Sequence, residues 1–172
     1  MIRRPEERRY AFETETIDRG QLRELSGLEV MTRIRDGALP WAAIAQTVGF
    51  RLVEVEPGRV VVEGEPEPFV YNMWGIAHGG YAATLLDTCM GCAVNTTVPR
   101  GSGYTTIDLT INYVRPARAG NGPVRAEGRV LHAGRRTATA EGRLLAADGR
   151  LLAHGLTTCL VFALGDVEAA GP

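Results

Sequence analysis

Residues 79–95 read GGYAATLLDTCMGCAVN, and this stretch decides the fold. It is rich in Ala, Leu, Met and Cys, and its one charged residue is Asp87. A helix that is apolar on all sides is buried, whereas a surface helix carries a polar face. We therefore predict a helix from about Gly79 to Asn95 that a sheet encloses.

The segments around this helix show the two-residue alternation of strands. Residues 50–55 and 59–63 flank Glu56-Pro57-Gly58, which indicates a hairpin. Four further strands are expected after the helix, over residues 104–114, 123–133, 136–147 and 150–162. The order of elements predicts an α+β fold in which a curved antiparallel sheet wraps around a central helix.

The first of the later strands shows the alternation most clearly, because its apolar residues occupy every second position. Ile107, Leu109, Ile111 and Tyr113 alternate with Thr106, Asp108, Thr110 and Asn112. Strict alternation places these two sets on opposite faces of the sheet.

The N-terminal region has helical rather than strand periodicity. Leu residues and Met31 recur every three positions after Asp18, which predicts one helix over 18–35 and a shorter one over 40–46. Residues 1–17 are charged and lack periodicity. We divide the chain into a tail with helices (1–47), a core domain (48–163) and a C-terminal tail (164–172).

Composition excludes several functional classes. The 172 residues suit one domain, and a net charge of −1 does not favour nucleic acid as a partner. There is no Lys, which excludes pyridoxal chemistry and a P-loop. Neither serine lies in a G-x-S-x-G motif. The sequence has no apolar run of membrane-spanning length and no signal peptide pattern, so we expect a cytoplasmic protein without membrane association.

The start of the predicted helix is suited to hold a developing negative charge. The first N–H groups of a helix have no internal partner and lie at the positive end of its dipole. Gly79 and Gly80 would let a ligand approach these groups closely. An oxyanion hole built from backbone N–H groups needs no charged side chain.

The acidic residue of the helix is too far away to act at that same helix start. Asp87 follows His78 by nine residues, which is roughly 13 Å along a helix axis. If both groups serve one site, they come from two subunits. A two-fold dimer with antiparallel central helices would create two equivalent sites.

At these residues the sequence resembles the hotdog-fold acyl-CoA thioesterases of the phenylacetate-degradation type. The resemblance extends from about residue 48 to residue 162. It is carried by Asn72, His78-Gly79-Gly80, Asp87, the run from Thr105 to Leu109, and Asn112-Tyr113-Val114-Arg115-Pro116. It implies a homodimer, or a homotetramer of paired dimers, that hydrolyses an acyl-CoA without metal or other cofactor.

The resemblance also assigns catalytic roles. The Gly79 N–H would polarise the thioester carbonyl, with Asn72 and His78 shaping that side of the site. Asp87 of the other subunit would attack directly or activate water. Thr106 stands where relatives have a hydroxyl that helps to hold the water. Because Gly91 replaces a hydroxyl side chain found in some relatives, this role would fall on Thr106 or Thr88.

Other residues are candidates for binding the substrate. Gly80 and Thr88 adjoin the catalytic candidates, and Trp74 lies between Asn72 and His78 in the sequence. Arg115 and Arg135 are expected at strand ends, where a guanidinium group would suit the phosphates of CoA. The helices over 18–46 would cover the acyl pocket or extend the dimer.

The cysteine pair of the predicted helix allows two interpretations. Cys89 and Cys92 have the spacing of a redox or zinc pair, but their place within an apolar helix favours buried core residues, and we expect no metal.

The sequence does not specify the acyl group of the substrate: small aromatic, short and medium chains all fit. A hotdog hydratase or dehydratase, or a non-catalytic acyl-CoA sensor, is the alternative function.

Overall fold

The computed structural model describes residues 7–12, 14, 16–118 and 122–165. The expected tails, 1–17 and 164–172, lie partly outside these residues. The helices are α1 (Arg19–Glu24), α2 (Gly27–Arg35), α3 (Ala43–Val48), the 3-10 turn η1 (Pro68–Val70) and α4 (Gly79–Asn95). The strands are β1 (Phe50–Glu56), β2 (Arg59–Gly64), β3 (Ser102–Tyr113), β4 (Val124–Ala133), β5 (Thr137–Leu145) and β6 (Leu151–Ala163).

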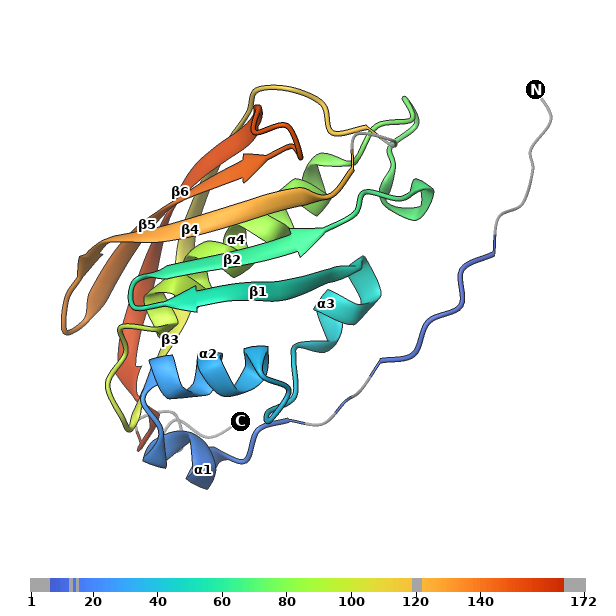
Figure 1. The fold of residues 1–172 in the computed structure, drawn as a ribbon. Helices are drawn as coiled ribbons and strands as arrows, with labels where there is room; N and C mark the ends of the chain where they lie inside the picture. The colour runs from blue at the N-terminus through green and yellow to red at the C-terminus, as the bar shows by residue number, and fades with distance from the viewer. Residues whose placement is uncertain (1–6, 13, 15, 119–121, 166–172) are drawn as a thin grey trace.

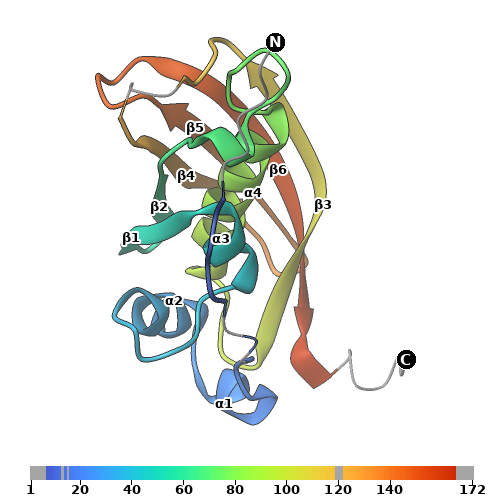
Figure 2. The same ribbon diagram turned by 90° about the vertical axis from the view of Figure 1, so that its right-hand side faces the viewer.

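One sheet curves around a single long helix (Figures 1 and 2). Its strands follow the order β1-β2-β4-β5-β6-β3, and every neighbouring pair is antiparallel. The predicted fold class is confirmed, and the predicted helix over 79–95 has the observed bounds of α4. None of the helices described is both long and apolar enough to span a bilayer.

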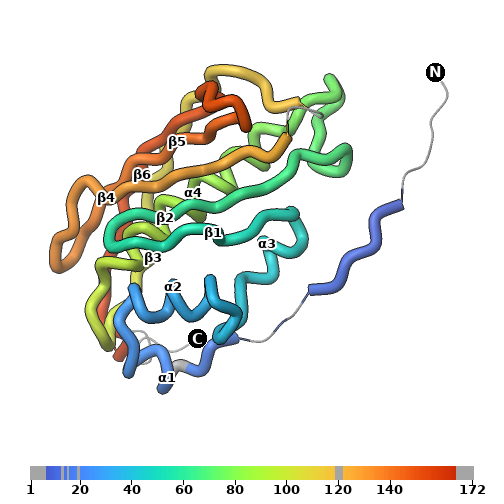
Figure 3. The backbone as a smooth tube through the Cα atoms, viewed as in Figure 1, coloured from blue at the N-terminus to red at the C-terminus, as the bar shows by residue number. Residues whose placement is uncertain are grey.

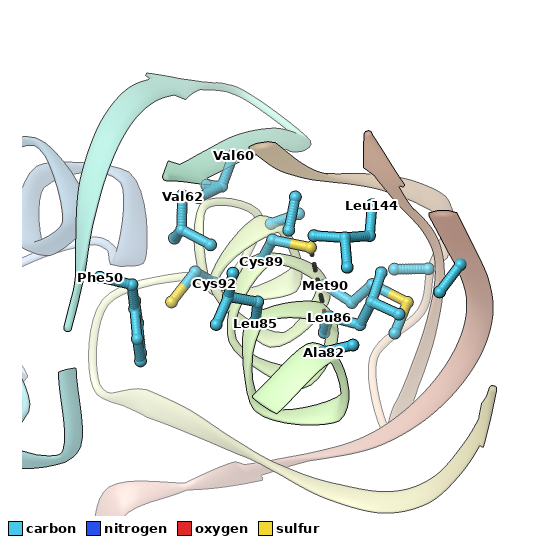
Figure 4. Packing of buried hydrophobic residues seen from close by; sticks show 14 of the residues in the cluster. Phe50, Val60, Val62, Ala82, Leu85, Leu86, Cys89, Met90, Cys92 and Leu144 are labelled. Atoms are coloured by element: carbon cyan, nitrogen blue, oxygen red, sulfur yellow. Dashed lines mark hydrogen bonds between the residues drawn. The ribbon is translucent and has the colours of Figure 1, made fainter. Parts of the chain in front are cut away.

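The helix lies directly against the concave face of the sheet. Leu85, Leu86, Cys89 and Met90 of α4 are fully buried, and they pack among side chains of β2 and β5 (Figure 4). Gly128 on β4 makes this approach possible, because a Cβ there would lie 2.3 Å from the carbonyl oxygen of Cys89. The apolar composition of α4 thus follows from its enclosure by the sheet.

The predicted alternation along β3 is wrong at its centre. The pairing of β3 with β6 shifts between Thr106 and Asp108, which marks a β-bulge. Ile107 is consequently 59% exposed, whereas Thr106 turns toward α4 and lies on the same side as Leu109. The bulge therefore re-aims the Thr106 hydroxyl into the interior.

The N-terminal helix predicted over 18–35 is two helices. Leu25 adopts an extended conformation, and Ser26 starts α2 with a capping box that it forms with Glu29. The short helix predicted from residue 40 begins only at Ala43 and ends where Gly49 takes a positive φ of 84°. Ser and Glu three residues apart were the sequence signal for this second helix start.

The helix α2 lies beside the edge strand β1 and crosses the C-terminal end of α4 (Figure 3). Gly27 allows this crossing, because a Cβ there would lie 1.7 Å from the carbonyl oxygen of Asn95. The Gly27 N–H donates to the carbonyl of Val98, and Arg100 forms an ion pair with Glu29 at 2.9 Å. These contacts attach α2 to the core of the molecule.

Candidate active site

The start of α4 presents one backbone donor without a partner. His78 is the N-cap, and its Nδ1 accepts a hydrogen bond from the Gly80 N–H at 2.9 Å. Among the described residues, none accepts from the Gly79 N–H. The predicted binding residue Gly80 therefore has its N–H occupied, and Gly79 offers the available donor at the positive end of the helix dipole.

His78 and Asn72 both shape the backbone leading into α4. The Asn72 carboxamide oxygen accepts from the Trp74 N–H at 2.9 Å and so forms an Asx turn. The His78 N–H donates to the carbonyl of Val70 at 2.8 Å. These hydrogen bonds hold the loop against the helix start, so both predicted residues have a positioning role that their sequence context left open.

Tyr113 is a further candidate site residue that the sequence analysis did not select. Its hydroxyl donates to the Gly79 carbonyl at 3.1 Å, and a Cβ on Gly79 would lie 3.2 Å from its ring. Tyr113 therefore covers the first turn of α4 on the side of β3. The sequence signal that could have identified Tyr113 is its position in the run Asn112–Pro116, two residues before Arg115.

A cavity of about 360 Å³ opens at this end of α4. Asn72, Gly79, Tyr113 and Arg115 all line it. Arg115 donates one hydrogen bond to the carbonyl of Leu151 at 3.0 Å, which fixes its guanidinium group at the rim while leaving other N–H groups for a ligand.

Asp87 lies in a second region of the same helix. It is half-buried, and its Oδ1 accepts a hydrogen bond from the Thr106 hydroxyl at 3.0 Å. Thr88, the neighbouring residue, donates its hydroxyl to the carbonyl of Thr84 at 2.7 Å. The bulge in β3 thus brings two predicted residues together, and one carboxylate oxygen of Asp87 stays available.

A larger cavity of about 640 Å³ surrounds Asp87. Thr88, Gly91 and Thr106 line it with Asp87, and most of the remaining wall comes from residues before 44. Among the described residues, this cavity shares no lining residue with the cavity at Gly79. One chain therefore presents the two groups at separate places.

Two predicted binding residues lie away from both cavities. Trp74 is 79% exposed on the turn that follows Asn72. Arg135 is exposed in the connection between β4 and β5. Neither residue is among those that line the cavity at Gly79 or the cavity at Asp87.

The cysteines of α4 are buried thiols. Burial raises the pKa of Cys92 to about 12 and that of Cys89 well above its usual value, which keeps both in the unreactive thiol form. No cluster of three or more His, Cys, Asp or Glu side chains in the described part of the chain could hold a metal ion. Cys89 and Cys92 are therefore buried residues of the hydrophobic core.

The sequence and fold match known proteins. Residues 75–153 match the model of the thioesterase superfamily. The chain is 38% identical to human acyl-coenzyme A thioesterase 13 over 69 residues, which are 40% of this chain and 49% of that protein. The chain thus spans about half the length of this curated relative.

Two solved structures match over most of their length. The protein smu.793 from Streptococcus mutans, solved bound to acetyl CoA, is 30% identical and has a TM-score of 0.62, with 67% of this chain and 90% of that chain covered. A mutant form of the phenylacetic acid degradation protein PaaI from Thermus thermophilus is 28% identical and has a TM-score of 0.64, with 69% and 98% covered.

Proposed function

Because this chain belongs to the thioesterase superfamily, with PaaI among its structural relatives, we propose that it hydrolyses the thioester bond of an acyl-CoA. The observation that carries the proposal is that the helix α4 presents both an unoccupied N–H at Gly79 and, in a separate cavity, an Asp87 carboxylate that Thr106 orients. An oxyanion donor and a base or nucleophile are the two groups that thioester hydrolysis requires.

In the proposed reaction, the carbonyl oxygen of the thioester accepts a hydrogen bond from the Gly79 N–H. Asp87 takes a proton from water, and the water oxygen bonds to the carbonyl carbon. The resulting oxyanion is stabilised at the positive end of α4. When the carbon–sulfur bond breaks, the proton that Asp87 accepted passes to the sulfur of CoA, which leaves as the thiol, and the free acid remains.

We propose that the site forms between two copies of the chain. The support is that Gly79 and Asp87 of one chain line separate cavities. The strand β3 is an edge of the sheet, so a second copy can pair there or pack against it with its own α4 antiparallel. Each Asp87 would then meet the Gly79 of its partner, and two equivalent sites would result.

Arg115 is the proposed contact for the CoA phosphates. It lies at the rim of the cavity at Gly79, and its planar group matches phosphate oxygens. Arg135 and Trp74 would reach the substrate only from a neighbouring subunit. A cytoplasmic location is also proposed, with support from the cysteines at 89, 92 and 159, which are all buried and free.

The test measures the release of free thiol from a panel of aromatic, short-chain and medium-chain acyl-CoAs. Release from at least one ester, with the free acid as second product, is the expected result. A thioether analogue of the best substrate controls for background, because its carbon–sulfur bond cannot be hydrolysed. Tight binding of acyl-CoA without release would overturn the proposal in favour of a sensor, and water addition to an enoyl-CoA would favour a hydratase.

A further inference from the structure

The cavity at Asp87 extends well beyond the catalytic candidates. On α4 its wall consists of Asp87, Thr88, Gly91, Cys92 and Asn95, which form one stripe along the helix. The distance from Asp87 to Asn95 is about 12 Å along the axis of an α-helix. The cavity therefore runs for two helical turns toward the point where α2 crosses α4.

The opposite wall is built by the N-terminal elements and is mostly apolar, with Thr14 and Thr16 as its polar members among the described residues. Side chains from the segment before α1 through the start of α3 supply it, among them Ile17, Leu22, Val30, Met31, Ile34 and Trp41. Within the described lining, Asp87 is the sole charged residue. An occupant with a charged end would find no oppositely charged side chain in this lining at the far side from Asp87.

This wall is fixed to the core, so the cavity has a defined depth. Met31 is 2% exposed and belongs to the main hydrophobic cluster, and Trp41 packs edge-on against Phe50 of β1 at a centroid distance of 6.2 Å. The ion pair between Glu29 and Arg100 ties α2 to the segment after α4. A ligand therefore meets a packed wall with a set position.

We propose that this cavity, whose wall is built by α2, the α2–α3 connection and the start of α3 and which we call the acyl chamber, takes the acyl group of the substrate and selects an uncharged chain of medium length. The inference rests on the proposed function, because Asp87 and Thr106 stand at the polar part of the same cavity. A length of about 12 Å accommodates roughly eight to ten carbon atoms in extended form. The volume of about 640 Å³ leaves room for such a chain.

The first test compares two neighbouring positions on α3. Ala43 lines the chamber, whereas Ile44 is 52% exposed and lies outside it. Ala43→Phe should lower kcat/KM for decanoyl-CoA by about tenfold or more, since it displaces several methylene groups, and lower that for acetyl-CoA far less. Ile44→Phe places the same ring outside the chamber and should leave both values unchanged.

The second variant enlarges the chamber. Ile34 is half-buried on α2, so Ile34→Ala should move the preferred chain length upward, toward dodecanoyl-CoA and longer. Thermal unfolding of all three variants establishes that each is folded. Equal losses for every chain length, equal effects at positions 43 and 44, or a wild-type preference for an aromatic acyl group would each overturn the proposal.

A binding measurement separates this inference from the proposed function. If no ester releases thiol, hydrolysis is refuted, while calorimetry with decanoyl-CoA still tests the chamber. Weaker binding by Ala43→Phe than by Ile44→Phe would support the chamber as the acyl site. Equal binding by the two variants would refute it.

Discussion

The first turn of α4 and its middle turn differ in what they offer a thioester. The first turn offers a backbone N–H at Gly79 and has no acidic residue, so it favours an oxygen that gains negative charge. The middle turn offers the Asp87 carboxylate, which the Thr106 hydroxyl holds. The two groups line separate cavities of one chain, and the proposed reaction therefore needs two half-sites from two copies of the chain.

The largest effect is expected at the middle turn. Asp87→Asn preserves shape but removes the base, and it should lower kcat by about 10²–10⁴-fold. The matched control is Asp108→Asn, because Asp108 lies just beyond the bulge of β3 and is exposed. Thiol release by both variants measures the difference, and comparable activity of Asp87→Asn and wild type would remove Asp87 from the mechanism.

The next effect is expected at the first turn, where the donor itself can be deleted. Proline is accepted at the first position of a helix and lacks the N–H, and His78 has the extended backbone that precedes proline well. Gly79→Pro should reduce kcat by about 10²–10³-fold, as measured by thiol release.

Gly79→Ala is the control for this deletion, because it makes the same close contact with Tyr113 but keeps the N–H. It should retain most of the activity. Equal losses in Gly79→Pro and Gly79→Ala would show that crowding, rather than the missing donor, is responsible.

The smallest effect of the series concerns the hydrogen bond that orients the carboxylate. Thr106→Val should reduce kcat by about 10- to 150-fold, since a hydrogen bond to a charged group contributes about 1.5–3 kcal/mol. Thr106→Ser keeps the hydroxyl and should stay near the wild-type value in the same assay. If Thr106→Ser were as impaired as Thr106→Val, the hydroxyl would not be the relevant group.

The fold could be predicted where the pattern of apolar residues alone determines the secondary structure. The apolar pattern over 79–95 predicted the observed bounds of α4. The observed ends of the strands differ from the predicted ends by at most two residues. The break at Leu25 was missed because the apolar spacing continues through it, although the Ser26–Glu29 capping box signals a new helix.

The candidate site could be predicted only in part. Asn72, Gly79 and Asp87 follow from motif and spacing, but the partner of Asp87 depends on a bulge that strict alternation cannot reveal. The occupation of the Gly80 N–H by His78 and the cover that Tyr113 provides depend on side-chain geometry. The chamber wall arises from residues far from the motif in sequence, which only the packing of α2 brings near Asp87.

The most direct test of the two half-sites is to mix two inactive chains. Asp87→Asn and Gly79→Pro subunits, co-expressed with different tags, would form mixed dimers that contain one intact Gly79 facing one intact Asp87. Since about half of the dimers are mixed and each has one complete site, about a quarter of wild-type activity should return. Purification through both tags should give about half of the wild-type activity per dimer. No recovery in the purified mixed dimer would contradict a site shared between subunits.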